Sequence, residues 1–440
     1  MNRLSRVLAE ARNLVAPSSS ETAKTAALAR SLLTKTKEAA KRFEETRGVL
    51  LGGSFAKGTW LPGNNDLDIF VKIDPSTPEN EFERIGLEIG ILATRGYPRG
   101  KKFAQHPYTE ATVDGVRVNI VPCYAVKKGR WKSAADRSPF HVEVVKNFPE
   151  SMKTDVRILK SFMNALGVYG AEIQRQGFSG YVAEVLVMKL KSLEGVLRWF
   201  ADFKPPTDDR IFSLPDPVDE GRDLGTAVSG ESLGRMVLAA REFLRRPGLA
   251  FFRSMSGRAH STMRGSVIGV VFSHKRLSED TLWGELRKTT KHMVRHVEMH
   301  GFRVARAMAA SNNSDKSAIL LIPEIWELPP VEQRVGPTVD RRKDVEAFIR
   351  SNAKESKLVW VDGDARVRLL KPRSYTRLSD LLKDVIRGGA GPSGASREIQ
   401  AAMKKSAAVM HGGPLTRAAS AAEWLQNGIR EITSDAVGTR

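Results

Sequence analysis

Two aspartates, Asp66 and Asp68, stand two positions apart after an expected glycine–serine turn at Gly52, Gly53 and Ser54. Apolar residues alternate with the aspartates and predict a strand, and because strand side chains alternate, both carboxylates share one face. The glycines let the backbone approach a bulky anion, and Ser54 adds a hydroxyl donor. Hard cations such as Mg²⁺ bind carboxylate oxygens together with substrate phosphate oxygens. The spacing therefore favours a metal and phosphate site over the alternative, a hairpin with two solvated aspartates.

Two neighbouring strands must hold these residues. A short buried strand at 49–51 ends at the glycine pair, Pro62 to Asn65 form a strong turn signal, and the next strand carries both aspartates. Apolar periodicity predicts helices before and after this region. They lie at 1–16, 21–47 and 79–95.

A hairpin is expected beyond the third helix. Asp114-Gly115 is a strong two-residue turn signal between strands at 109–113 and 116–121. Alternation places the valine and isoleucine residues of the second strand on one face and Arg117 and Asn119 on the other. The turn itself accounts for Asp114.

The remaining pattern predicts an α+β multidomain fold. Helices dominate 154–199, a loop rich in proline, aspartate and glycine covers 204–230, and a helix follows at 233–244. Later strands at 266–272 and 317–326 enclose a helix at 279–300, and a hairpin pairs 359–361 with 367–370. We expect four domains: an N-terminal catalytic domain at 1–150, a helical central domain at 151–260, an α+β domain at 261–385 and a helical tail at 386–440.

The formal net charge of +20 indicates a polyanion as partner, since clustered lysine and arginine bind phosphates strongly. No run of ~18 apolar residues suggests a membrane span. The start of the chain lacks the apolar core of a secretory signal. Cys123 is the single cysteine, which excludes an internal disulfide and a cysteine-rich zinc site and favours the reducing cytoplasm. The sequence does not decide between a monomer and a homodimer.

The residues from Gly53 to Asp68 resemble the signature of the polymerase β-like nucleotidyltransferases, and their wider wording is similar to the archaeal-type (class I) CCA-adding enzymes. Further blocks resemble that family in its own order, and together they cover residues 50–255. They are His106 to Tyr108, Val121 to Tyr124, Asp136 to His141, Tyr169 to Glu172, Gly177 to Tyr181 and Asp216 to Arg222. The resemblance implies a nucleotidyltransferase head with a mixed sheet, a helical nucleotide-selecting domain and an RNA-binding C-terminal body.

The family's chemistry is template-independent addition of C, C and A to the 3′ end of tRNA. The resemblance implies CTP and ATP as substrates, the tRNA acceptor arm and 3′ end as partner, and two Mg²⁺ ions as cofactors. Asp66 and Asp68 match the metal-binding carboxylates of the family. Residues that match contacts to the triphosphate are Ser54, Lys57, Lys160 and Tyr169, with His141 beside the same pocket. Arg222 matches the arginine that reads the incoming base.

Each of these residues also has a purely structural interpretation. Lys160 can be a solvated lysine, Tyr169 a packed aromatic residue, and His141 a cap at a helix start after Pro139. Arg222 can pair with Asp216 or Asp219 for structure alone.

Asn119 departs from the family, which has its third metal-binding aspartate there. An amide oxygen can coordinate a cation but brings no charge. The departure leaves three interpretations open: an enzyme with weakened chemistry, a binding-only relative that holds tRNA or nucleotide, and a variant inactivated by design. A separate alternative is an oligonucleotide synthase of the innate-immune type, which shares the first signature but is not expected to carry the later blocks.

Overall fold

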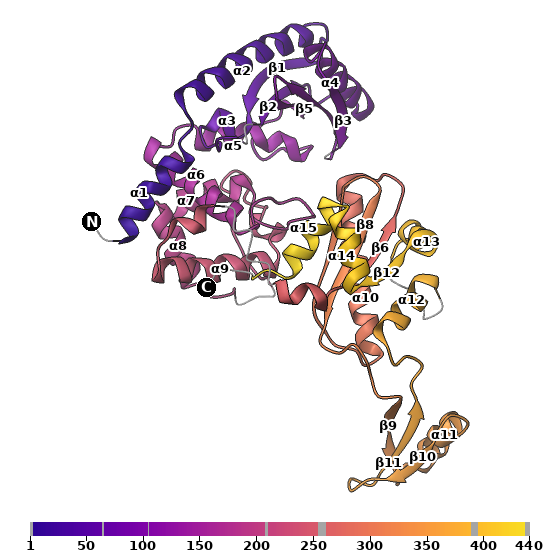
Figure 1. The fold of residues 1–440 in the computed structure, drawn as a ribbon. Coiled ribbons are helices and arrows are strands. Elements are labelled where there is room, and N and C mark those ends of the chain that lie inside the picture. Colours follow the sequence, from indigo (N-terminus) through magenta and orange to yellow (C-terminus); the bar gives the residue numbers. More distant parts are fainter. Residues whose placement is uncertain are drawn as a thin grey trace. The chain divides into compact units, whose positions relative to one another are not determined.

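The computed structural model describes residues 3–63, 66–103, 105–206, 210–253, 261–388 and 395–435. The chain divides into two compact units, Met1–Ser256 and Gly257–Asp435, and each is described by itself. The expected α+β class is confirmed, because helices and three sheets share the chain (Figure 1). No helix among the described residues is long and apolar enough to cross a membrane.

The first unit contains a five-stranded mixed sheet of order β1-β2-β5-β4-β3. Its strands are β1 (Thr46–Gly52), β2 (Leu67–Ile73), β3 (Arg99–Phe103), β4 (Pro107–Val113) and β5 (Val116–Tyr124). The pair β2 and β5 is parallel, and the other neighbours are antiparallel. Helices α2 (Ser19–Ala40) and α4 (Glu79–Ala93) pack on the apolar face, and α3 (Gly53–Lys57) and α5 (Ser138–Val145) lie on the other side (Figure 1). The second face is therefore the one that displays Asp68 and Asn119.

Three expectations for this region were wrong in detail. The helix expected to reach residue 47 ends at Ala40, because Thr46 already pairs with Ile73 and sheet pairing overrides the helical pattern. Residues after Gly52 form the short helix α3 rather than an open turn. Asp66 precedes β2 instead of lying in it. Of the expected turn, Asn64 and Asn65 lie outside the described residues, whereas Asp114 and Gly115 form the hairpin turn with positive φ.

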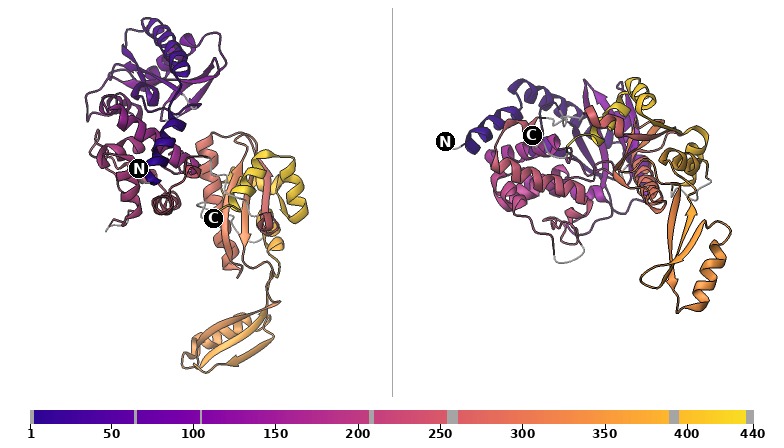
Figure 2. Two further views of the ribbon diagram at one scale, coloured as in Figure 1. Left: turned by 60° about the vertical axis from the view of Figure 1, so that its left-hand side comes forward. Right: turned by 60° about the horizontal axis from the view of Figure 1, so that its bottom comes forward.

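Helices complete the first unit (Figure 2). They are α1 (Arg3–Val15), α6 (Glu150–Ala165), α7 (Gly180–Leu190), α8 (Leu193–Ala201) and α9 (Gly230–Arg245). The helical region expected at 154–199 is broken after α7, since Lys191 has a φ of 69° and Ser192 caps α8 by accepting from the Gly195 N–H. A large apolar core joins all five helices.

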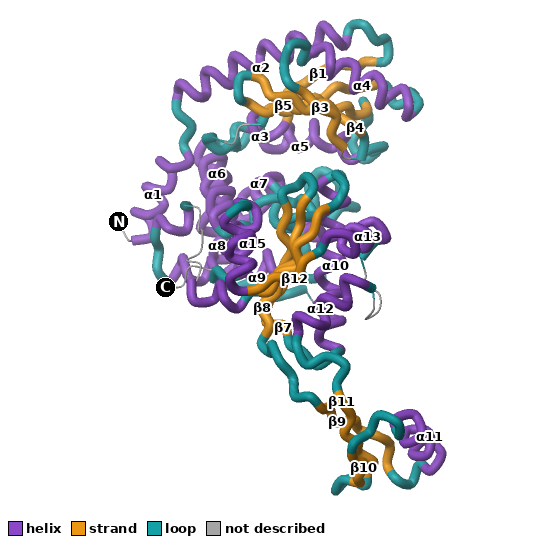
Figure 3. Tube along the Cα trace, turned by 45° about the vertical axis from the view of Figure 1, so that its right-hand side comes forward, coloured by secondary structure: helices purple, strands orange, loops and turns teal. Residues whose placement is uncertain are grey.

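The second unit has two sheets. The first has the order β12-β6-β8-β7, with β6 (Ile268–Ser273), β7 (Val304–Ser311), β8 (Lys316–Pro323) and β12 (Ala408–His411). Helices α10 (Glu279–Met299), α12 (Leu378–Arg387) and α13 (Arg397–Ser406) pack on one face, and α14 (Gly412–Ser420) and α15 (Glu423–Ile432) on the other. The second sheet, β10-β11-β9, joins β10 (Leu358–Val361), β11 (Arg366–Pro372) and β9 (Val331–Thr338), and α11 (Arg342–Asn352) lies along it (Figure 3). The sequence did not predict β7, β9, α11, α12 or β12.

Candidate active site

Two carboxylates at the start of β2 lie beside two hydrogen-bond donors from β5. The parallel register places Asp68 opposite Asn119, and the Asn119 Nδ2 donates to Asp68 Oδ1 over 2.9 Å. Two residues earlier along both segments, the Arg117 guanidinium forms an ion pair with Asp66, which directly precedes β2. The two carboxylates therefore share a face, as the sequence predicts, and each one already has a hydrogen-bond donor from β5.

Gly53 allows the Asp68 carboxylate to lie against the start of α3. The residue has a φ of +64°, and a Cβ there would overlap the Asp68 carboxylate. A side chain at this position is therefore excluded both by the left-handed backbone and by the lack of space. Ser54 is the next residue of α3 and is half-buried.

The electrostatics of Asp68 favour a cation. Burial raises the pKa of Asp68, Asp66 raises it further, and the hydrogen bond from Asn119 opposes both effects. Because a nearby positive charge stabilises the ionised carboxylate, a bound cation would lower this pKa again.

The donor set also fits a hard divalent ion. Asn119 Oδ1 is buried and has no hydrogen-bond partner, so an oxygen ligand is left over beside the two carboxylates. Carboxylate and amide oxygens are ligands of Mg²⁺, which completes its shell with water and substrate phosphate. Asp66, Asp68 and Asn119 are the residues that would hold the ion, with two negative charges among them.

Lys57 and Lys160 meet on a buried glutamate that the sequence did not single out. Lys57 Nζ lies 2.5 Å from Glu184 Oε2, and Lys160 Nζ lies 3.1 Å from Glu184 Oε1. Glu184, on α7, is fully buried, and Lys160 is 1% exposed. Burial alone would raise the pKa of Glu184, but the two lysines lower it to about 2. The carboxylate therefore stays ionised and holds two lysines of the expected triphosphate pocket.

Lys160 uses its remaining protons on Thr59. Its Nζ donates to the Thr59 carbonyl over 3.0 Å and to the Thr59 hydroxyl over 3.1 Å. All three ammonium protons thus have acceptors, so the solvated interpretation of this lysine is wrong. Tyr169 lies close by, since a Cβ on Gly180 would meet both the Tyr169 hydroxyl and the Lys160 ammonium. Burial raises the pKa of Tyr169.

Arg222, His141 and Tyr181 converge on Asp216. Arg222 Nη1 lies 3.4 Å and His141 Nε2 3.5 Å from Asp216 Oδ2, and the Tyr181 hydroxyl donates to Oδ1 over 3.1 Å. The His141 ring stacks on Tyr181 with centroids 3.7 Å apart. His141 lies inside α5, which begins at Ser138, and therefore does not cap that helix. Burial alone would raise the pKa of Asp216, but the neighbouring His141 imidazole, the Val218 N–H and the Tyr181 hydroxyl lower it to about 2. Burial lowers the pKa of His141.

The alternative that Arg222 pairs with a loop aspartate is thus correct for Asp216. Asp219 instead pairs with Arg137, whose Nε lies 2.6 Å from its Oδ2. The pair with Asp216 does not use up Arg222, because its side chain remains 45% exposed. The guanidinium is held at one edge and keeps donors available at the other.

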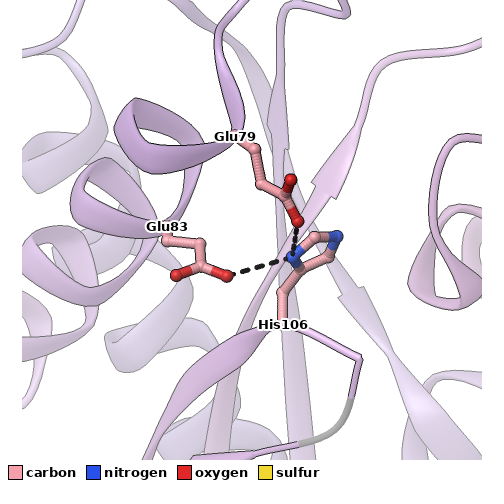
Figure 4. Close-up of side chains that lie close together, drawn as sticks. All are labelled: Glu79, Glu83 and His106. Carbon is pink, nitrogen blue, oxygen red and sulfur yellow. Dashed lines mark hydrogen bonds and ion pairs between the residues drawn. The ribbon is translucent and has the colours of Figure 1, made fainter.

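A separate group of two carboxylates and a histidine lies on the opposite face of the sheet. His106 Nδ1 is 3.2 Å from Glu83 Oε1 and 3.5 Å from Glu79 Oε1 (Figure 4). The His106 ring packs edge-on against Phe82, which stacks on Tyr124 in the apolar core under α4. The sheet therefore separates this group from Asp66 and Asp68.

Three family models match the chain in succession. They describe a nucleotidyltransferase domain at residues 33–143, a second domain of tRNA nucleotidyltransferase at 154–253, and the C-terminal domain of CCA-adding enzymes at 264–412. The CCA-adding enzyme of Pyrobaculum islandicum is 33% identical over 402 residues, which cover 88% of this chain and 95% of the relative. That of Methanothermobacter thermautotrophicus is 33% identical over 362 residues, covering 77% and 79%. The chain belongs to the CCA-adding enzyme family.

Membership in the CCA-adding enzyme family makes the chain a tRNA nucleotidyltransferase with a nucleotidyltransferase head. It confirms the resemblance drawn from the motifs between Gly53 and Arg222. Among solved structures, that of a cytoplasmic RNA terminal U-transferase has a TM-score of 0.43 and 15% identity over 56% of this chain and 94% of its own.

The sequence did not single out three side chains that orient the residues of this site. They are Glu184, Asp216 and Arg117. Glu184 had a signal, a lone carboxylate in an apolar helical run, and such a residue is rarely buried unless it is paired. Asp216 was considered only as a partner of Arg222. Arg117 was assigned to the same face as Asn119, and its ion pair with Asp66 follows from the parallel register of β2 and β5.

Proposed function

We propose that this member of the CCA-adding enzyme family adds C, C and A to the 3′ end of tRNA, using CTP and ATP. The observation that carries the proposal is the pair of carboxylates, Asp66 and Asp68, on one face beside Gly53, within the segment that matches a nucleotidyltransferase domain. The terminal 3′-hydroxyl of the tRNA attacks the α-phosphate of the nucleotide, and pyrophosphate leaves. Asp66 and Asp68 would hold Mg²⁺, which would supply stabilisation of the negative charge that develops during this transfer.

The triphosphate lies against α3 in this proposal. Ser54 donates its hydroxyl, and Lys57 supplies a positive charge that Glu184 fixes in place. Lys160 on α6 and Tyr169 in the loop after it line the same side of the triphosphate pocket. The Lys160 ammonium is held in place by Thr59 and Glu184. Because these side chains are already held by hydrogen bonds and ion pairs, they can position the triphosphate in a fixed orientation.

Selection of the base falls to Arg222. The arginine is half-exposed, and Asp216 orients it. Guanidinium donors suit the acceptor atoms of cytosine and the ring nitrogens of adenine, which fits acceptance of CTP and ATP.

Asn119 weakens this chemistry in the proposal. A site with two carboxylates would hold a second Mg²⁺ less tightly than a site with three, because one negative charge is missing. We therefore expect slow addition of nucleotides with near-normal binding of CTP, ATP and tRNA.

A binding-only relative is the second candidate, and one observation favours it. The Asn119 amide donates to Asp68 and Arg117 pairs with Asp66, so both carboxylates have partners without a metal. The match to the C-terminal domain of CCA-adding enzymes supports tRNA as substrate over the oligonucleotide synthase alternative.

Incorporation of labelled CTP and ATP into tRNA that lacks its CCA end tests the proposal. We expect slow, Mg²⁺-dependent addition that stops after CCA, with Asp68→Ala as the inactive control. Addition by neither the parent nor Asn119→Asp, together with intact tRNA binding, would instead support the binding-only relative.

A further inference from the structure

Arg117 provides a permanent positive charge at the first of the two carboxylates. It lies on β5 two residues before Asn119, on the same face, and its guanidinium contacts Asp66. An arginine guanidinium keeps its positive charge throughout the pH range in which proteins are folded.

Arg117 and Asn119 change the charge of the site in the same direction. Asn119 contributes a neutral amide, and Arg117 offsets one of the two remaining carboxylate charges. A single net negative charge is left for divalent ions, and it is concentrated on Asp68, the carboxylate that lies against Gly53 and α3.

We propose that Arg117 is a built-in cation that occupies the position of one divalent ion beside Asp66, so that this site binds a single divalent ion. That ion would be held at Asp68, the carboxylate that lies against Gly53. A second ion can bind only if it displaces the guanidinium from Asp66. The inference rests on the proposed function for the identity of the site, but it concerns only the competition between Arg117 and metal.

Titration with Mn²⁺ alone, followed by the electron paramagnetic resonance signal of free Mn²⁺, tests this competition in the full chain. Arg117→Gln should bind Mn²⁺ about tenfold more tightly than the parent, since a unit charge a few ångströms from a divalent ion is only partly screened. The gain should vanish when Asp66→Ala is added to Arg117→Gln.

The matched control is Arg47→Gln. Arg47 pairs with Asp74 at 2.8 Å on the same sheet, with side-chain exposures of 47% and 26% against 54% and 33% for Arg117 and Asp66. The Arg47→Gln substitution removes an equal charge from a similar ion pair away from the site. The Mn²⁺ affinity of this variant should therefore equal that of the parent. Melting temperatures of all variants verify folding, and because Arg117 is half-exposed we expect them to agree within a few degrees.

Two results would overturn the inference: Mn²⁺ affinity of Arg117→Gln within twofold of the parent, or no detectable Mn²⁺ binding by either protein. Both results come from Mn²⁺ titrations without tRNA or nucleotide. They can therefore be distinguished from a failure of the proposed function. That failure appears as an absence of CMP and AMP incorporation by the parent, Asn119→Asp and the variant that combines Arg117→Gln with Asn119→Asp. If both proposals hold, the combined variant should be faster than Asn119→Asp.

Discussion

Replacing Asn119 by aspartate should make metal binding and folding stability depend on each other. The Asn119 Nδ2 donates to the ionisable Asp68 over 2.9 Å, so Asn119→Asp exchanges a hydrogen bond for a contact between two carboxylates. Loss of a hydrogen bond to a charged group costs about 2 kcal/mol, and repulsion of like charges adds to that cost. In EDTA the free energy of unfolding should therefore fall by about 2 kcal/mol or more.

Mg²⁺ should reverse this effect and speed up the reaction. A third carboxylate favours the ion beside the attacking hydroxyl, and stabilisation of the transition state by about 3 kcal/mol corresponds to a rate increase of about 100-fold. The affinity for CTP should change little.

The assay is single-turnover incorporation of CMP across a Mg²⁺ titration, paired with urea unfolding in EDTA and in Mg²⁺. Equal rates for the two proteins at every Mg²⁺ concentration would refute the reasoning. In that case another carboxylate completes the site, and Glu110 is the one to test, because β4 places it directly opposite Asn119.

Asp66→Ala or Asp68→Ala should abolish nucleotide addition and leave tRNA binding nearly intact; a mutant that retains near-parental turnover in Mg²⁺ would contradict the metal assignment. Arg222→Ala should reduce discrimination of CTP and ATP against UTP and GTP more than triphosphate affinity, as measured by competition assays, and unchanged selectivity would count against its role. Glu184→Gln should cost about 3 kcal/mol in urea unfolding at pH 7, because two buried lysines lose their counter-ion. The pKa of Glu184 is lowered to about 2, so its contribution is full above pH 4.5 and the difference between parent and variant should shrink as pH falls toward 2. Affinity for a tRNA minihelix should fall steeply with salt and exceed that for duplex DNA in filter binding; equal affinities would argue against recognition of an A-form helix.

Features set by neighbouring residues were predictable from the sequence. The Asp114-Gly115 turn fixes the hairpin, and strand alternation places Asn119 on the face of Asp68. Gly53 has a φ of +64°, a left-handed backbone conformation that favours glycine.

Features that depend on distant pairing were not predictable from local pattern. Glu184 joins Lys57 across 127 positions of the chain, and α7, which carries it, packs against α6. The strand β12 forms because Ala408 pairs with Val271, while its own sequence reads as an alanine-rich helix. In both places the tertiary partner, rather than local propensity, decides the outcome.

The Lys57–Glu184–Lys160 network also limits how modular this chain can be. The catalytic sheet contributes one lysine through α3, and the carboxylate and the second lysine come from α7 and α6. A head domain grafted onto another helical partner would carry a buried ammonium without a counter-charge, and the abandoned helices would keep an unbalanced ion of their own. Recombination with a relative that lacks one of these three charged residues should therefore succeed only when the crossover keeps α3, α6 and α7 from the same parent.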